Sequence, residues 1–144
     1  MATVMRKMNV ISRCEALYRM QHMQAHLPGI YHSYILAICH MPGSSQDKLV
    51  KHMCVNKSSV TRHIAYLEEN GYVERRQGAD KREILVYPTQ KMLDVYNEVM
   101  EITKKWNTLL AEGISAEEME LFHSILDKMF ERSQELAAPG EITE

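Results

Sequence analysis

The sequence has few cysteines and no long apolar run. Its 144 residues contain three cysteines, an odd number without CxxC spacing, so we expect no disulfide framework. No apolar stretch approaches the roughly 20 residues that cross a bilayer. The N-terminus alternates polar and apolar residues and does not form the apolar core of a signal peptide. We therefore expect a cytoplasmic protein that is not inserted in a membrane.

Motifs of common enzyme and metal classes are also missing. The sequence has no Gly-rich phosphate loop, no zincin motif and no nucleophile elbow. His22 and His26 are four residues apart on a predicted helix, a spacing that can bind zinc, but no third ligand is evident nearby. We therefore expect no enzyme, no cofactor and no metal site, and a zinc-sensing regulator is the weaker alternative.

Charge is unevenly distributed along the chain. The formal net charge is −2, yet residues 48–91 carry nine basic and five acidic side chains, a local charge of +4, which leaves −6 for the remainder. Such a partition is typical of a polyanion-binding module attached to an acidic scaffold. Chance clustering of solvated charges is the alternative reading.

The apolar spacing predicts a mainly helical protein with one hairpin. Asn56, Thr89 and the capping box Ser115–Glu118 are expected to begin helices, and the tail after Ala138 is expected to fray. The expected helices cover residues 4–26 and 31–41, residues 46–53, Asn56 to Asn70, Thr89 to Gly113, and the chain from Ser115 onward, and the expected strands cover 72–76 and 83–87.

The order of elements between Tyr31 and Tyr87 is that of a winged helix-turn-helix, which places its last helix in the DNA major groove. Val60, Ile64 and Leu67 are expected in the core. Side chains on the other face of that helix, at the start of the preceding helix and in the hairpin loop are then candidate DNA contacts. They are Ser45, Gln46, Lys57, Ser58, Ser59, Thr61, Arg62, Asp80, Lys81 and Arg82.

The run from Ser59 to Arg75, followed by Asp80-Lys81-Arg82, resembles the MarR (multiple antibiotic resistance regulator) family. The resemblance covers the Thr-Arg pair of the recognition helix, the Leu-Glu-Glu-x-Gly exit and the Asp-x-Arg of the wing. It implies a single MarR-like domain over 1–144, mainly α with a small β-hairpin wing. Residues 30–88 would form the winged helix-turn-helix lobe, and 1–29 and 89–138 the dimerisation helices.

The same resemblance implies a homodimeric transcriptional regulator, usually a repressor, that binds double-stranded DNA at a palindromic operator. A small aromatic or phenolic effector would release it. The family's ligand crevice lies between the dimer helices and the DNA lobe, and its candidate lining here is Met8, Arg19, His22, Tyr34 and Ile38. One departure is the sequence Pro88-Thr89-Gln90-Lys91-Met92, where the family usually has Leu-Thr-x-x-Gly, which predicts a stiffer start of the long helix.

The terminal helices carry more apolar side chains than one small lobe can cover, and a second copy is expected to bury them. These side chains include Met5, Met8, Ile11, Trp106, Phe122 and Phe130.

Two alternative functions stay open at this stage. Cys14 resembles the reactive thiol of the family's organic-peroxide sensors, with Tyr18 and Tyr34 as its companions, so the chain can also be a thiol-based oxidant sensor. Cys39 and Cys54 are expected inside apolar faces as structural residues. The other alternative is a winged-helix adaptor that binds proteins and not DNA, against which the basic display at Arg62 and the wing counts.

Overall fold

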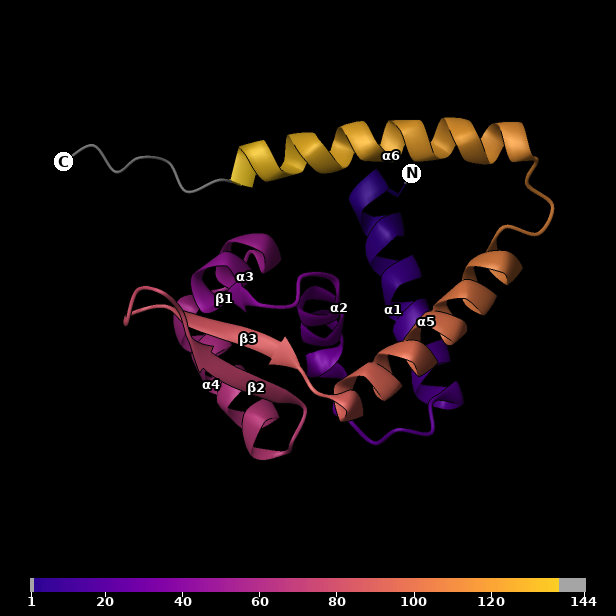
Figure 1. Ribbon diagram of the computed structural model, residues 1–144. Helices are drawn as coiled ribbons and strands as arrows, with labels where there is room; N and C mark the ends of the chain where they lie inside the picture. Colours follow the sequence, from indigo (N-terminus) through magenta and orange to yellow (C-terminus); the bar gives the residue numbers. More distant parts are fainter. Residues whose placement is uncertain (1, 138–144) are drawn as a thin grey trace. The chain divides into compact units, whose positions relative to one another are not determined.

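The structure is a computed structural model that describes residues 2–137. The tail predicted to fray after Ala138 lies outside these residues. The chain forms two compact units that divide between Trp106 and Asn107. The predicted class, mainly α with a small β-hairpin wing, is confirmed (Figure 1). The first unit contains, in chain order, α1 (Val4–His22), the 3-10 turn η1 (Gly29–Tyr31), α2 (His32–His40), β1 (Ser44–Ser45), α3 (Gln46–Met53), α4 (Lys57–Glu69), β2 (Val73–Gln77), β3 (Ile84–Pro88) and most of α5 (Gln90–Leu110).

The strands form one antiparallel sheet in the order β1-β3-β2. Strands β2 and β3 make the predicted hairpin, with Arg75 opposite Val86. Strand β1 has no signal in the sequence, because two residues are too few for a periodic pattern. Its residue Ser44 pairs with Val86 of β3. Figure 1 shows the hairpin loop at the far end of β2 and β3 from the start of α5, so the wing extends away from that helix.

Helix α1 ends four residues earlier than the sequence predicts, at His22. The chain that follows is held by α5 instead, because the Glu98 carboxylate accepts hydrogen bonds from the backbone amides of Gln24 and Ala25. His26 therefore lies beyond the helix and does not share a helical face with His22. The prediction that His22 and His26 lie on one helix is therefore wrong.

A common apolar core lies between α2, α3, α4, the sheet and α5. The three α4 residues predicted for it, Val60, Ile64 and Leu67, are all 0% exposed. Burying this stripe determines which side of α4 faces outward. Other fully buried side chains are Ile38, Leu49, Val86, Met92 and Val99.

The exit of α4 and the start of α5 are joined through Thr89. Gly71 ends the turn after α4 with a φ of +78°, a conformation that glycine adopts without steric cost. The Thr89 hydroxyl lies 2.6 Å from the Gly71 carbonyl oxygen, to which it donates. The Thr89 hydroxyl oxygen in turn accepts from the Met92 amide at 3.4 Å, so Thr89 caps α5 as predicted.

The second unit is built on α6 (Ala116–Ala137). Its predicted capping box is confirmed, since the Ser115 amide donates to the Glu118 carboxylate at 2.8 Å and the Glu118 amide donates to the Ser115 hydroxyl at 3.2 Å. None of the residues from Ala116 to Ala137 is buried. Residues 2–137 thus leave an apolar stripe along α6 uncovered.

Candidate nucleic-acid interface

Helix α4 presents a polar face to solvent. Its N-cap is Asn56, as predicted, and the Asn56 side-chain oxygen accepts from the Ser59 amide at 2.8 Å. With the apolar stripe buried on the other side, Lys57, Ser58, Thr61 and Arg62 are exposed and Ser59 is half-buried. The predicted recognition surface on α4 is therefore accessible.

The two predicted contacts at the start of α3 are less accessible. The Ser45 hydroxyl caps α3 by accepting from the Lys48 amide at 3.1 Å. Gln46 is only 9% exposed, and its side-chain nitrogen lies 3.5 Å from the Thr61 hydroxyl. Its side-chain oxygen has no hydrogen-bond partner within residues 2–137. Gln46 therefore packs against α4 beside Thr61, and its role as a DNA contact stays a prediction.

The wing loop is ordered by Asp80. Its carboxylate accepts from the backbone amide of Arg82 at 3.0 Å, and its carbonyl accepts from the Glu83 amide at 2.9 Å. The Asp80 carboxylate thus orders the backbone of the loop at Arg82. Lys81 and Arg82 keep exposed side chains, and long cations at a loop tip can reach a groove or a phosphate.

Several basic groups of the 48–91 segment are already paired. Arg75 on β2 donates to the Glu68 carboxylate at 2.8 Å, and the Arg75 amide donates to the same carboxylate at 3.0 Å. These hydrogen bonds hold the pKa of the Glu68 carboxyl below its usual value. Arg76 pairs with Glu74 at 3.0 Å. The Arg75 pair attaches β2 to α4, whereas the exposed Arg76 pair lies within β2.

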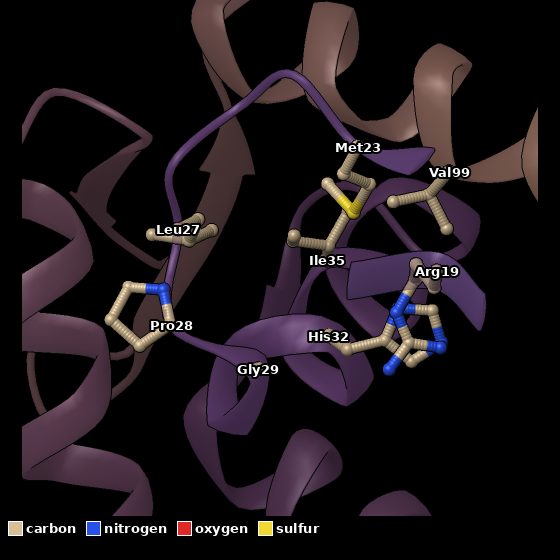
Figure 2. Close-up of a pocket in the computed structure, with 8 residues that line it drawn as sticks. All are labelled: Arg19, Met23, Leu27, Pro28, Gly29, His32, Ile35 and Val99. Carbon is tan, nitrogen blue, oxygen red and sulfur yellow. The ribbon is translucent and has the colours of Figure 1, made fainter. Parts of the chain in front are cut away.

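A small crevice lies beside α1, α2 and α5, and Figure 2 shows its lining. With its open mouth, which includes solvent space, it measures about 230 Å³. It is lined by Arg19, Met23, Leu27, Pro28, Gly29, His32, Ile35 and Val99.

The charged group of this crevice is Arg19, which is 8% exposed. Its guanidinium donates to the Glu15 carboxylate at 2.6 Å and lies 3.2 Å from the His32 ring nitrogen. Burial lowers the pKa of His32, the Arg19 charge lowers it further, and Glu15 opposes both. A buried cation beside a neutral imidazole is a setting that an anion can enter.

Of the five residues predicted for a ligand crevice, only Arg19 lines it. Ile38 is fully buried, and Tyr34, 3% exposed, has its hydroxyl 2.8 Å from His63. The His22 ring stacks on Tyr18, and the half-buried Met8 does not reach the crevice. The sequence did not predict Met23, Leu27 and His32 as lining residues. Met23 and Leu27 lie in the loop after α1, and most of that loop was predicted as helix.

Two comparisons bear on this arrangement. The sequence pattern of the MarR family matches residues 32–84, which run from the start of α2 to the start of β3. The uncharacterized HTH-type transcriptional regulator YwoH from Bacillus subtilis (strain 168) is 40% identical over 86 residues, 60% of this chain and 62% of that protein. Residues 32–84 of this chain are thus similar to the MarR family. The match spans less than two thirds of the length of YwoH.

Solved structures share the MarR fold. A MarR-family transcriptional regulator from Listeria monocytogenes, in complex with a 26-mer DNA, has a TM-score of 0.84 at 24% identity, covering 95% of this chain and 93% of that chain. A MarR protein from Peptoclostridium difficile has a TM-score of 0.83 at 24% identity, covering 94% and 90%. At these identities the likeness shows the fold.

The three cysteines of the chain lie in different settings. Burial raises the pKa of the half-buried Cys39 to about 11, which suits a structural thiol. Cys54 is exposed and has a φ of +53° at the end of α3, so its predicted place inside an apolar face is wrong. Cys14 is exposed on α1, and its redox role stays a prediction.

The described residues show neither a cluster of metal ligands nor a helix that could span a membrane. Across residues 2–137, no three side chains of the His, Cys, Asp and Glu types converge as metal ligands would. In the same part of the chain, every helix is too short or too polar to cross a bilayer.

Proposed function

We propose that this chain is a sequence-specific transcription regulator that binds double-stranded DNA at a palindromic operator as a homodimer. The observation that carries the proposal is the outward face of α4, where Lys57, Thr61 and Arg62 are exposed above a fully buried stripe. Arginine can pair with guanine through two hydrogen bonds, and lysines neutralise phosphates. The exposed Arg82 of the wing adds a second point of contact. The DNA complex of the Listeria relative supports this assignment.

The DNA-binding proposal is tested on duplexes that the wild-type protein selects from a random pool. Arg62→Ala is expected to lower affinity for the selected duplex by about 1–3 kcal/mol and to relax discrimination at particular bases. Arg82→Ala is expected to weaken binding to all duplexes and to reduce the salt slope by about one unit. Binding isotherms at several salt concentrations measure both effects.

The charge-matched control is Arg132→Ala on α6, whose guanidinium pairs with Glu135 at 2.8 Å. It removes the same charge from another surface and should leave the isotherms unchanged. Unchanged affinity for both Arg62→Ala and Arg82→Ala would contradict the assigned face. A folded wild-type protein that binds no duplex would favour the adaptor function instead.

The dimer is supported by the uncovered apolar side chains of α1 and α6. Twofold association of the same face from two copies would bury these residues and also match the symmetry of a palindromic operator. The exposed apolar residues are Val4, Met5, Val10 and Ile11 on α1 and Phe122, Ile125, Met129 and Phe130 on α6.

We further propose repression that a small aromatic acid relieves by binding the Arg19 crevice. The buried guanidinium of Arg19 supplies a positive charge, and Met23, Leu27 and Val99 supply apolar walls for one ring. A carboxylate entering there would compete with Glu15 for Arg19. A ligand therefore binds only if the free energy gained by burying its ring exceeds the cost of weakening the Arg19–Glu15 ion pair.

Thermal unfolding with benzoate as the probe tests the effector proposal. Benzoate should raise the Tm of the wild type and release it from the selected duplex, whereas the cation benzylamine should do neither. Arg19→Gln should abolish the benzoate response. An equal benzoate shift in wild type and Arg19→Gln would contradict the crevice as the ligand site.

A further inference from the structure

An aromatic cluster joins α2 to the recognition helix α4. The Tyr34 hydroxyl lies 2.8 Å from Nδ1 of His63, and the two rings meet edge to face at 5.1 Å between centroids. Beside them, the Tyr31 ring stacks on Tyr66 at 4.7 Å with an angle of 6° between the ring planes. Two residues at the start of α2 thus contact two residues of α4 through specific ring geometry.

The cluster lies directly behind the proposed DNA-binding face. His63 follows the exposed Arg62 in the chain and is half-buried, whereas Tyr31 is 7% and Tyr34 3% exposed. Tyr34 is therefore buried behind α4 and out of reach of DNA. Any influence of Tyr34 on binding must pass through the position of α4.

The rest of the α4 contact is mainly apolar. The buried stripe of Val60, Ile64 and Leu67 holds α4 against the core by burial, which is non-directional. A hydrogen bond has preferred distance and angles. The Tyr34–His63 hydrogen bond can therefore fix the rotation of α4 about its own axis, which apolar packing alone defines less sharply. A rotated α4 would present Thr61 and Arg62 to different base edges.

We propose that Tyr34 and His63 are positioning residues that determine the sequence selectivity of DNA binding without touching DNA. This inference rests on the proposed function. It assigns to Tyr34 a role that differs from the ligand contact expected from the sequence. It also places a specificity-determining residue in α2, outside the helices that face the duplex.

The chain contains a matched pair that serves as a control. His40 at the end of α2 lies 2.8 Å from the Tyr96 hydroxyl on α5, and these rings also meet edge to face, at 5.5 Å. This pair also joins a tyrosine hydroxyl to an imidazole nitrogen and uses the same helix α2, but it is exposed and links α2 to α5. A general loss of a Tyr–His hydrogen bond can thus be separated from a loss at the recognition helix.

The experiment compares affinities for a duplex selected by the wild type and for a random duplex. Tyr34→Phe, which removes one oxygen and keeps the ring, should lower the ratio of the two affinities about three- to tenfold and leave the affinity for the random duplex unchanged. Tyr96→Phe should leave the ratio as in the wild type. His63→Phe should behave like Tyr34→Phe. His63→Asn should restore selectivity, because its amide places a hydrogen-bonding atom where Nδ1 was.

Failure of this inference is distinguishable from failure of the proposed function. A wild type that shows no preference among duplexes would overturn the proposed sequence-specific function. A wild type that discriminates, together with a Tyr34→Phe variant that discriminates equally well, would overturn only the positioning role. Equal losses of selectivity in Tyr34→Phe and Tyr96→Phe would overturn it as well, as would a His63→Asn variant no better than His63→Phe.

Discussion

Helices α4 and α6 have similar apolar spacing and opposite burial. In α4, Val60 and Ile64 are four residues apart and 0% exposed, whereas in α6 Phe122, Ile125 and Met129 are spaced three and four and are 50%, 48% and 40% exposed. The same periodicity therefore accompanies a complete core in one helix and an uncovered stripe in the other. Periodicity indicates that a helical face needs cover, but it does not say which element, or which copy of the chain, supplies that cover.

The largest expected effect lies in the α4 core. Leu67→Ala should lower the free energy of unfolding by about 2–5 kcal/mol, because it leaves a cavity in a fully packed site. Leu136→Ala makes the same change on α6, where the side chain is 72% exposed, and should stay within about 0.5 kcal/mol. Urea denaturation measures both. An equal loss for the two variants would break the contrast between α4 and α6.

The next effect tests whether a second copy covers α6. Phe122→Glu should convert a dimer of about twice 16.7 kDa to the monomer, because a carboxylate on the apolar stripe cannot be buried unpaired. Light scattering at micromolar concentration gives the mass. Ser124→Glu adds the same charge at an exposed polar position of α6 and should leave the mass unchanged. A wild type that is already monomeric would contradict the dimer.

The sequence predicted those features of the fold that depend on local signals. Asn56 and Ser115 are side-chain caps with a known spacing to the amides they accept from, and Gly71 ends α4 because its φ is positive. Strand β1 and the early end of α1 depend on partners far along the chain. Val86 pairs with Ser44, and Glu98 binds the amides after α1. No window of neighbouring residues contains those partners.

The same division explains the candidate site. The exposed set on α4 followed from its buried stripe, so its members could be named in advance. The burial of Gln46 could not be predicted, because it depends on the approach of Thr61 from another helix. The crevice around Arg19 is made by three helices and a loop. The sequence could suggest Arg19 as a lining residue of a ligand crevice. His32 and Met23 join Arg19 only through tertiary packing.

A smaller expected effect is the pH dependence of the folding stability of the first unit. Burial and the charge of Arg19 lower the pKa of His32, so the unfolded chain binds this proton more readily than the folded chain. The stability that His32 contributes is present above its unfolded pKa of about 6.5. It is lost as the pH falls toward the lowered folded value. Denaturation between pH 7.5 and 5 should show this loss, and His32→Gln should flatten it. His123→Gln on α6, an exposed position, should not.

The smallest expected effect is the loss of one carboxylate contact. Two such contacts are compared: one joins α4 to β2, and the other caps α6. Glu68 joins α4 to β2 through Arg75, and Glu118 caps α6 through Ser115; these contacts hold the pKa of each carboxyl below its usual value. Both contributions are therefore present above the unfolded pKa of about 4.3 and are lost as the pH falls through the lowered folded value.

The Glu68 pair is about one third exposed, so Glu68→Gln should cost about 1 kcal/mol or less. Its specific signature is local: the Arg75 amide loses a charged acceptor and should exchange its hydrogen faster in NMR measurements, while the Glu118 amide keeps its rate. Glu118→Gln should produce the reverse pattern, because the Ser115 amide depends on that carboxylate. If either variant accelerated exchange at both sites, the cap of α6 and the α4–β2 link would open together, and the two units would not be energetically separate.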